Sequence, residues 1–331
     1  GHPTGQNPPA GAVVYYWLKT PRQVVTMDFL DSKGAVIRSF TSSQDPTVAA
    51  DSVRADSVRA AHADSLRRAG VKPDTATQSE TRGEETPPGE DGSRRTPPPP
   101  RVANKAGLNM FSWNLRYPDA STFQNMIFWA AGTQGPVAVP GTYSVRINVG
   151  GRSETQTFRV VNDPRSTATQ PVLDDQFAFL IAVRDKTTQA NDAIRRIRNV
   201  KAQLTDRVAA MPAAQQPPFR ARAEALSAQL SAVEAEIYQV KNQSGQDPLN
   251  FPIRLNNKIA ALAGVAASTD ARPTDQTREV FRILSAQLDA QLSRLSTELG
   301  SLSAINVDLK AAGQKEIVPS TEEPKRQPAA L

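Results

Sequence analysis

The sequence predicts an immunoglobulin-like antiparallel β-sandwich followed by an antiparallel four-helix bundle. Residues 107–161 contain runs with the period-2 alternation of half-buried strands, and Gly150-Gly151 is a two-residue hairpin signal between two of these runs. From about residue 172 to residue 313, apolar residues instead recur at helical spacing. A chain of 331 residues is long enough for two such domains.

The first half of the sandwich is expected over residues 12–42. Residues 1–11 are rich in Pro and Gly and are interpreted as a linker. Three β-prone runs follow, over residues 13–18, 24–30 and 35–40. A tight turn ending at Gly34 separates the last two runs.

The second half of the sandwich is expected over residues 101–164. Asn109, Phe111, Trp113 and Leu115 alternate with other residues in the first run, and two further runs cover 142–149 and 155–161. Together with the N-terminal runs, these approach the roughly seven strands of an immunoglobulin-like fold.

Residues 43–100 interrupt the sandwich with a low-complexity insert. ADSVR occurs twice in tandem, ADSLR follows, and the remainder is rich in Pro, Thr and Glu. Few apolar groups are available to offset the entropy of ordering, so we expect a disordered insert with one short helix near 47–69. An alternative hypothesis is a docking arm that orders only on a partner, through Val53, Val58 and Leu66.

Four amphipathic helices are expected over residues 172–313. Pro212 ends the first, whose middle is polar where a core is expected, and Leu226, Leu230, Val233, Ile237 and Val240 form a heptad seam in the second. A short third helix contains Ile259. Thr274 or Asp275 caps the fourth, which reaches Leu302. Residues 314–331 are expected to be a flexible tail.

Composition excludes several classes of chemistry. The chain has no cysteine, so disulfides and thiolate metal sites cannot form. Its two histidines, His2 and His62, lack a ligand-like pattern around them, and we predict neither a metal nor a cofactor. No run approaches ~20 apolar residues, so no transmembrane segment is expected. The chain begins at Gly1 without an initiator methionine, which suggests a processed product or a piece of a longer chain.

A catalytic pair is not evident in the sequence. Glycoside hydrolysis needs two carboxylates facing each other across a cleft. Asp174 and Asp175 are adjacent near a predicted helix start, where attraction to the helix dipole is the favoured explanation. We therefore predict no catalytic residues and no enzymatic activity.

Two groups of residues are candidate contact surfaces for partners. Met126, Phe128 and Trp129 belong to an apolar run that is either an exposed patch or, as favoured, a buried sandwich strand. Arg195, Arg196 and Arg198 form a basic cluster that could bind nucleic acid or anionic lipid. Neighbouring aspartates dilute its charge, which favours a solvated helix face and argues against nucleic acid.

Several stretches resemble a known family. GQNPPAGAVVYYWL, VVTMDFLDSKGAVIRSF, AGLNMFSWNLRYP and VPGTYSVRINVGG are similar to the C-terminal region of bacterial sortilin-type BNR-repeat propeller proteins. PLNFPIRLNNKIAALAGVAASTDARPTDQTREVFRILSAQLDAQL resembles the helical segment that ends these proteins. The resemblance implies an exported protein, periplasmic or extracellular. The chain contains no propeller blades, so the glycosyl hydrolase label of that family does not carry over.

Two functional classes follow from these observations. The first is a non-enzymatic structural or interaction subunit that docks on protein subunits of a larger bacterial assembly, with peripheral contact to a membrane surface. A respiratory or photosynthetic complex would be a suitable host. The second is a carbohydrate-binding or accessory module cleaved from a propeller-type glycosyl hydrolase, for which clustered exposed aromatics would be the signature.

Overall fold

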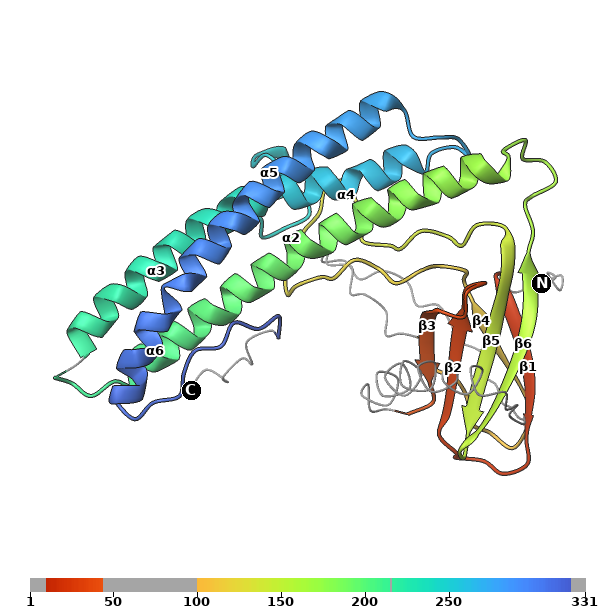
Figure 1. Cartoon of the computed structure of the whole chain (residues 1–331), viewed down its shortest axis with the longest axis horizontal. Helices are drawn as coiled ribbons and strands as arrows, with labels where there is room; N and C mark the ends of the chain where they lie inside the picture. The colour runs from red at the N-terminus through yellow and green to blue at the C-terminus, as the bar shows by residue number, and fades with distance from the viewer. Residues whose placement is uncertain (1–9, 44–99, 215, 323–331) are drawn as a thin grey trace, which may run out of the picture. The chain divides into compact units, whose positions relative to one another are not determined.

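The computed structural model describes residues 10–43, 100–214 and 216–322 (Figure 1). The chain forms two compact units. The β unit consists of the described residues up to Pro118 together with 136–170, and the helical unit consists of 119–135 and the described residues from Pro171 onward. This division differs from the expected one, because residues 119–135 were assigned to the sandwich and instead group with the helices.

The larger sheet of the β unit has four antiparallel strands in the order β3-β2-β5-β6. Its strands are β2 (Val25–Leu30), β3 (Val36–Thr41), β5 (Gly141–Val149) and β6 (Arg152–Val160). Gly150 and Gly151 form the two-residue loop between the paired Val149 and Arg152, with φ angles of 54° and 80°. Positive φ at both positions is what a hairpin turn of this length requires, so the predicted hairpin is confirmed.

The smaller sheet has two antiparallel strands, β1 (Ala12–Leu18) and β4 (Gly107–Trp113). Trp17 lies opposite Leu108 and Tyr15 lies opposite Met110. The predicted strand extended to Leu115, but that residue has φ +61°, which an extended strand cannot contain. β4 therefore ends at Trp113.

Both sheets contribute side chains to one aromatic core. Trp113 is fully buried, stacks on Phe29 with ring centroids 4.7 Å apart, and contacts the edge of Tyr143. Its indole Nε1 donates a hydrogen bond to the carbonyl of Arg116 at 3.0 Å. The even spacing of apolar side chains along the strands thus places large rings from β2, β4 and β5 in one layer.

The helical unit contains helices packed around a single aliphatic core. They are α2 (Gln170–Ala210), α3 (Gln216–Ile237), α4 (Leu255–Ala266), α5 (Asp275–Gly300) and its short continuation α6 (Leu302–Ala311), with the 3-10 turn η1 (Asp247–Leu249). Figure 1 shows α2 and α5 running side by side, and a ring contact between Phe179 and Phe281 joins them. Counting α5 and α6 as one broken helix, the described residues form four packed helices, as expected.

Most of the expected helix signals are confirmed. Leu226, Leu230, Val233 and Ile237 are buried, and the Thr274 side chain caps α5 by accepting a hydrogen bond from the Thr277 amide. Two details are wrong. The heptad seam does not include Val240, because α3 ends at Ile237 and Val240 is exposed. Leu302 lies in α6 beyond a break at Ser301.

The segment after α6 differs from the expected flexible tail over its described part, residues 314–322. Ile317 is buried in the helical core, and its backbone N–H and C=O both bond to the side chain of Asn306. Gln203 of α2 likewise bonds the backbone of Val318 at both groups. The expected tail beyond residue 322 lies outside the described residues.

Candidate partner-binding surfaces

Residues 119–135, here called the strap, cross the surface of the helical unit without helix or strand. Phe123 anchors the strap in the helical core, where it meets the edge of Tyr238 with ring centroids 4.8 Å apart. Asn125 and Ala130 have φ angles of 60° and 46°, and these left-handed residues break any extended pairing. The strap therefore needs partners other than a strand for its backbone polar groups.

Side chains of the helices supply those partners. The Ile127 N–H donates to the Tyr238 hydroxyl at 3.1 Å, and that hydroxyl donates to the Asn125 carbonyl at 3.2 Å. The Asn257 side chain accepts from the Trp129 N–H at 2.7 Å and donates to the Trp129 carbonyl at 2.9 Å. Two side chains thus satisfy four backbone groups, which a buried irregular segment requires.

A buried amide network extends this attachment into the helices. Asn191 donates from Nδ2 to the Ser121 carbonyl at 2.6 Å, while its Oδ1 accepts from Asn256 at 3.1 Å. Both asparagines are fully buried. Among the polar residues in the middle of α2, Thr187 and Asn191 are therefore core residues with hydrogen-bond partners, and Asn191 holds the strap.

Arg198 fastens the same segment by charge. Its Nε donates to Glu234 at 2.7 Å and its Nη1 donates to the Gln124 carbonyl at 3.1 Å. The guanidinium also lies over the rings of Phe123 and Tyr238, at 4.7 and 5.6 Å from their centroids. Burial raises the pKa of the Tyr238 hydroxyl above its usual value of about 10, so the neutral phenol persists into alkaline solution.

The predicted contact residues Met126, Phe128 and Trp129 all lie on the strap. Their interpretation as a buried sandwich strand is wrong, because the strap has no strand pairing. Met126 packs against the helical core and Phe128 is half-buried, whereas Trp129 is 37% exposed. A partner contact through this patch stays a prediction, with Trp129 as its most accessible member.

The predicted basic cluster separates into three environments. Arg195 pairs with Asp192 at 3.4 Å, and Arg198 is used internally. Arg196 is exposed and has no ion pair within the described ranges. Val53, Val58 and Leu66 lie outside the described residues.

Asp174 and Asp175 lie beyond the first turn of α2, so attraction to the helix dipole does not account for them. Asp175 accepts hydrogen bonds from Arg272 at 3.1 Å and Arg278 at 2.8 Å. Its carboxylate therefore joins α2 to the start of α5. This is a structural role for a residue that was weighed as a catalytic candidate.

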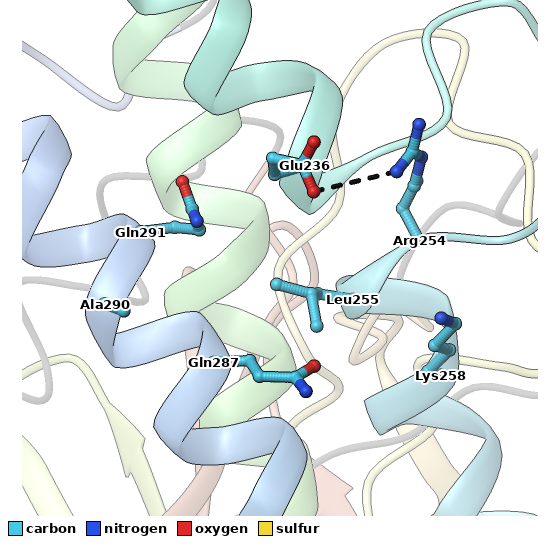
Figure 2. A pocket seen from close by; sticks show the side chains of 7 residues that line it. All are labelled: Glu236, Arg254, Leu255, Lys258, Gln287, Ala290 and Gln291. Carbon is cyan, nitrogen blue, oxygen red and sulfur yellow. Dashed lines mark ion pairs between the residues drawn. The ribbon is translucent and has the colours of Figure 1, made fainter.

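A polar pocket of about 270 Å³ lies where α3, α4 and α5 meet (Figure 2). It is lined by Glu236, Arg254, Leu255, Lys258, Gln287, Ala290 and Gln291. Glu236 and Arg254 form an ion pair at 3.7 Å, as Figure 2 shows. With one carboxylate in its lining, the pocket does not contain the facing pair that glycoside hydrolysis uses.

Within the described ranges, no group of three or more His, Cys, Asp or Glu side chains could hold a metal ion. In the same part of the chain, no helix combines the length and apolar character needed to cross a bilayer. The two histidines of the sequence are outside these ranges.

An exposed apolar surface lies on the outer face of the β1–β4 sheet. This outer face consists of Val13, Tyr15, Trp17, Leu108 and Met110, which alternate with core residues such as Tyr16 and Trp113. Tyr15, Trp17 and Leu108 are 63, 59 and 62% exposed. Single exposed apolar side chains are common on protein surfaces, but neighbouring ones of this size mark interaction surfaces.

The sequence analysis missed this outer face. Residues 13–18 are apolar at every position, so alternation does not show which side faces solvent. A usable signal was the composition of β4, the strand that pairs with β1. β4 carries the apolar residues Leu108 and Met110 on the same side of the sheet as Trp17 and Tyr15. Two strands that are apolar on both faces predict a sheet with a second surface to cover.

No protein-family model, no curated protein and no solved structure matches the chain.

Proposed function

We propose that the protein is a non-enzymatic interaction subunit that docks on a larger, membrane-bound bacterial assembly outside the cytoplasm. A respiratory or photosynthetic complex is the suggested class of host. In this proposal the β unit is an immunoglobulin-like sandwich and the helical unit is an antiparallel four-helix bundle. Two antiparallel sheets around one aromatic core and helices around one aliphatic core support these fold assignments.

The outer face of the β1–β4 sheet carries this proposal. Tyr and Trp are enriched at protein interfaces because they bury large apolar areas at a small cost in side-chain entropy. Trp17 and Leu108 are direct cross-strand neighbours, and Tyr15 continues the row. Contacts made in a membrane-bound assembly, whether with protein subunits or with the bilayer, would remove this continuous apolar strip from water.

The test uses membranes prepared from native cells that express a tagged chain. After mild detergent extraction and gradient sedimentation, we expect the parent chain to migrate with a large assembly. The double variant Tyr15→Ser/Trp17→Ser should migrate as free protein, because it lacks the two aromatic contact residues. It should still fold, because both substituted side chains are exposed. Val161→Ser is the matched control, since Val161 is 71% exposed elsewhere in the β unit. Retention of the double variant at the parental level would contradict the proposal.

A second contact of the same subunit is proposed for the insert, residues 43–100. Loop closure entropy grows slowly with length, so the fold should tolerate removal of residues 44–100. We expect the deletion variant to fold and to be retained less tightly in the assembly. Equal retention would make the insert a tolerated linker.

Catalytic silence is part of the proposal. The purified chain is expected to hydrolyse no glycoside, ester or peptide above background. Activity that disappears in Asp174→Asn or Asp175→Asn would overturn this expectation.

The alternative function is a carbohydrate-binding or accessory module of a propeller-type hydrolase. One observation favours it: Tyr15 and Trp17 are exposed two residues apart on one sheet face, a spacing of roughly 7 Å over which rings can stack on neighbouring sugars. Affinity electrophoresis in gels containing polysaccharides distinguishes the two functions. Retardation by a polysaccharide that Tyr15→Ser/Trp17→Ser abolishes would establish the alternative.

A further inference from the structure

One end of the β unit gathers cationic side chains. The loop from Lys19 to Val24 follows β1, and Arg22 and Asn104 join it to the segment before β4 through a backbone hydrogen bond of 2.7 Å. The Gly150-Gly151 turn lies at the same end, because Val149 pairs with Val25. The basic end, as we call it, contains the exposed side chains of Lys19, Arg22, Arg101, Lys105 and Arg152.

These cations have no ion pairs within the described ranges. Of the acidic groups in the described β unit, Asp28 is buried, Asp31 lies at the opposite end of β2, and Asp163 pairs with Arg165 at 2.6 Å. Glu154, two residues beyond Arg152 on β6, is the one acidic residue of the described β unit near this end. The described β unit has eleven Lys and Arg side chains against four Asp and Glu. The basic end therefore presents a concentrated positive potential to whatever approaches it.

Arg22 occupies a backbone position that favours glycine. Its φ is +64°, in the left-handed region, and the residue follows Pro21 in the loop. Such a conformation is unfavourable for a residue with a Cβ, and strained positions of this kind concentrate at functional sites. The chain thus keeps a charged side chain where glycine would relax the backbone.

Apolar side chains adjoin the cations on the same surface. Trp17 and Leu108 are the outer-face residues nearest the basic end, because Leu18 pairs with Gly107 at the end of the sheet. Val24, in the loop itself, is 52% exposed. Along the β1–β4 sheet, the cations of the basic end are therefore adjacent to an apolar surface that begins with Trp17 and Leu108.

We propose that the basic end and the adjoining Trp17 and Leu108 bind the headgroup region of an anionic bilayer. This proposal rests on the proposed function, for which it names the bilayer as the contact of Trp17 and Leu108 and leaves Tyr15 and Met110, further along the outer face, to the protein subunits. Anionic headgroups attract Lys and Arg, and tryptophan prefers the boundary between headgroups and acyl chains. A nucleic acid duplex would match the cations but would leave the apolar layer uncovered, since its bases are stacked inside the helix and its phosphates are contacted through charge and hydrogen bonds.

Vesicle sedimentation tests the proposal with the purified full chain and no other protein. The probes are vesicles of phosphatidylcholine alone and of phosphatidylcholine with phosphatidylglycerol. We expect binding to the anionic vesicles, weakened by added salt because the Debye length shortens, and at least about tenfold weaker binding to the neutral vesicles. Equal binding to both vesicle types, or binding to neither, would overturn the proposal.

Three variants locate the contact. Arg22→Gly/Lys105→Gln removes two charges while relaxing the backbone at residue 22, and should weaken binding by at least about tenfold, at roughly fivefold per charge. Trp17→Ser should weaken binding at both low and high salt, because its contribution is apolar. Lys33→Gln is the matched control, since Lys33 lies in the turn at the opposite end of β2 and should leave binding unchanged. Equal loss in Lys33→Gln would show attraction by net charge alone and would overturn the assignment of the basic end.

The outcomes separate this proposal from the proposed function. If the parent chain does not bind vesicles but is retained in the native assembly, the lipid contact is wrong, whereas the proposed function as an interaction subunit is unaffected. A heparin or DNA affinity that exceeds vesicle affinity and depends on Arg22 and Lys105, but not on Trp17, would assign the basic end to a polyanion instead.

Discussion

The two units of this protein use charge in opposite ways. The described residues of the helical unit contain eighteen basic and eighteen acidic side chains, whereas the β unit has eleven basic against four acidic. In the helices, cations pair across elements, as Lys186 does with Asp289 at 2.5 Å and Arg278 with Asp175 at 2.8 Å. In the β unit, cations such as Lys19 and Lys105 are exposed without such pairs in the described ranges.

The same contrast holds for apolar surface. The helical unit buries Phe123 of its strap against Tyr238, whereas the β unit leaves Tyr15 and Trp17 largely in water. Where charges and rings are paired internally, the structure itself explains them. Where they are left over on one surface, an external partner is the simplest explanation.

The largest expected effect tests the β core. Trp113→Ala should lower the free energy of unfolding of the β unit by about 3–5 kcal/mol, because a fully buried indole leaves a cavity. Denaturant unfolding followed by tryptophan fluorescence and by circular dichroism measures it. Leu108→Ala, an exposed neighbour on β4, is the control. A near-neutral Trp113→Ala would mean that the rings of the two sheets do not share a core.

The next effect tests the buried amides beneath the strap. Asn191→Ala should cost about 2–3 kcal/mol, because the Ser121 carbonyl and the Asn256 amide lose a partner in a buried site. Arg196→Ala, on an exposed face of the same helix, should be close to neutral. The unfolding midpoint of the helical signal is the measurement. Equal effects of the two variants would contradict the idea that polar groups in this unit serve internal attachment.

A smaller effect comes from the Tyr238 hydroxyl. Tyr238→Phe removes two hydrogen bonds to the strap and should cost about 1–2 kcal/mol near neutral pH. In the parent chain the pKa of this phenol is raised by burial, so the folded form binds its proton more tightly than the unfolded form. Stability is therefore expected to be constant below pH of about 10 and to fall as the pH rises from there toward the raised pKa.

Urea midpoints between pH 8 and pH 11 test the sign of this dependence. The Tyr238→Phe variant should show a shallower alkaline loss than the parent chain. A parent whose stability rises over that range would contradict the burial of the phenol.

The smallest expected effects concern the cations of the β unit. Lys105→Gln should change stability by less than about 0.5 kcal/mol, because the side chain is exposed. Arg22→Gly should stabilise the fold slightly, by up to about 1 kcal/mol, because glycine accepts φ +64° without strain. Thermal unfolding at low salt measures both. A large loss in either variant would show that these charges are structural, as those of the helical unit are.

The regular elements could be predicted from the sequence because their signals are local. β-prone composition identified the N-terminal strands, alternation identified the later ones, Gly150-Gly151 identified a hairpin, and Thr274 identified the start of a helix. Such signals need only a few neighbouring residues. They do not determine an element's last residue, and the predicted ends at Leu115 and Val240 were wrong for that reason.

The strap could not be predicted because its partners are distant in sequence. NMIFWAAG has the composition of a strand, yet its backbone bonds go to Tyr238 and Asn257, more than 100 residues away. The internal pairing of Arg198 could not be predicted for the same reason, since its partner Glu234 is on another helix. The outer face of the β1–β4 sheet escaped for a different reason, because a run that is apolar on both sides does not reveal which side is covered.

The order of synthesis along the chain affects when the strap can dock. Its residues leave the ribosome before any of the helices on which it lies, and Asn257, which bonds Trp129, follows more than 120 residues later. Phe123 has no ring partner until Tyr238 is synthesised, and Trp129 has no backbone partner until Asn257 follows. At a synthesis rate of about 5–20 residues per second, the longer interval lasts on the order of ten seconds. The nascent chain therefore exposes two large aromatic residues until these partners emerge.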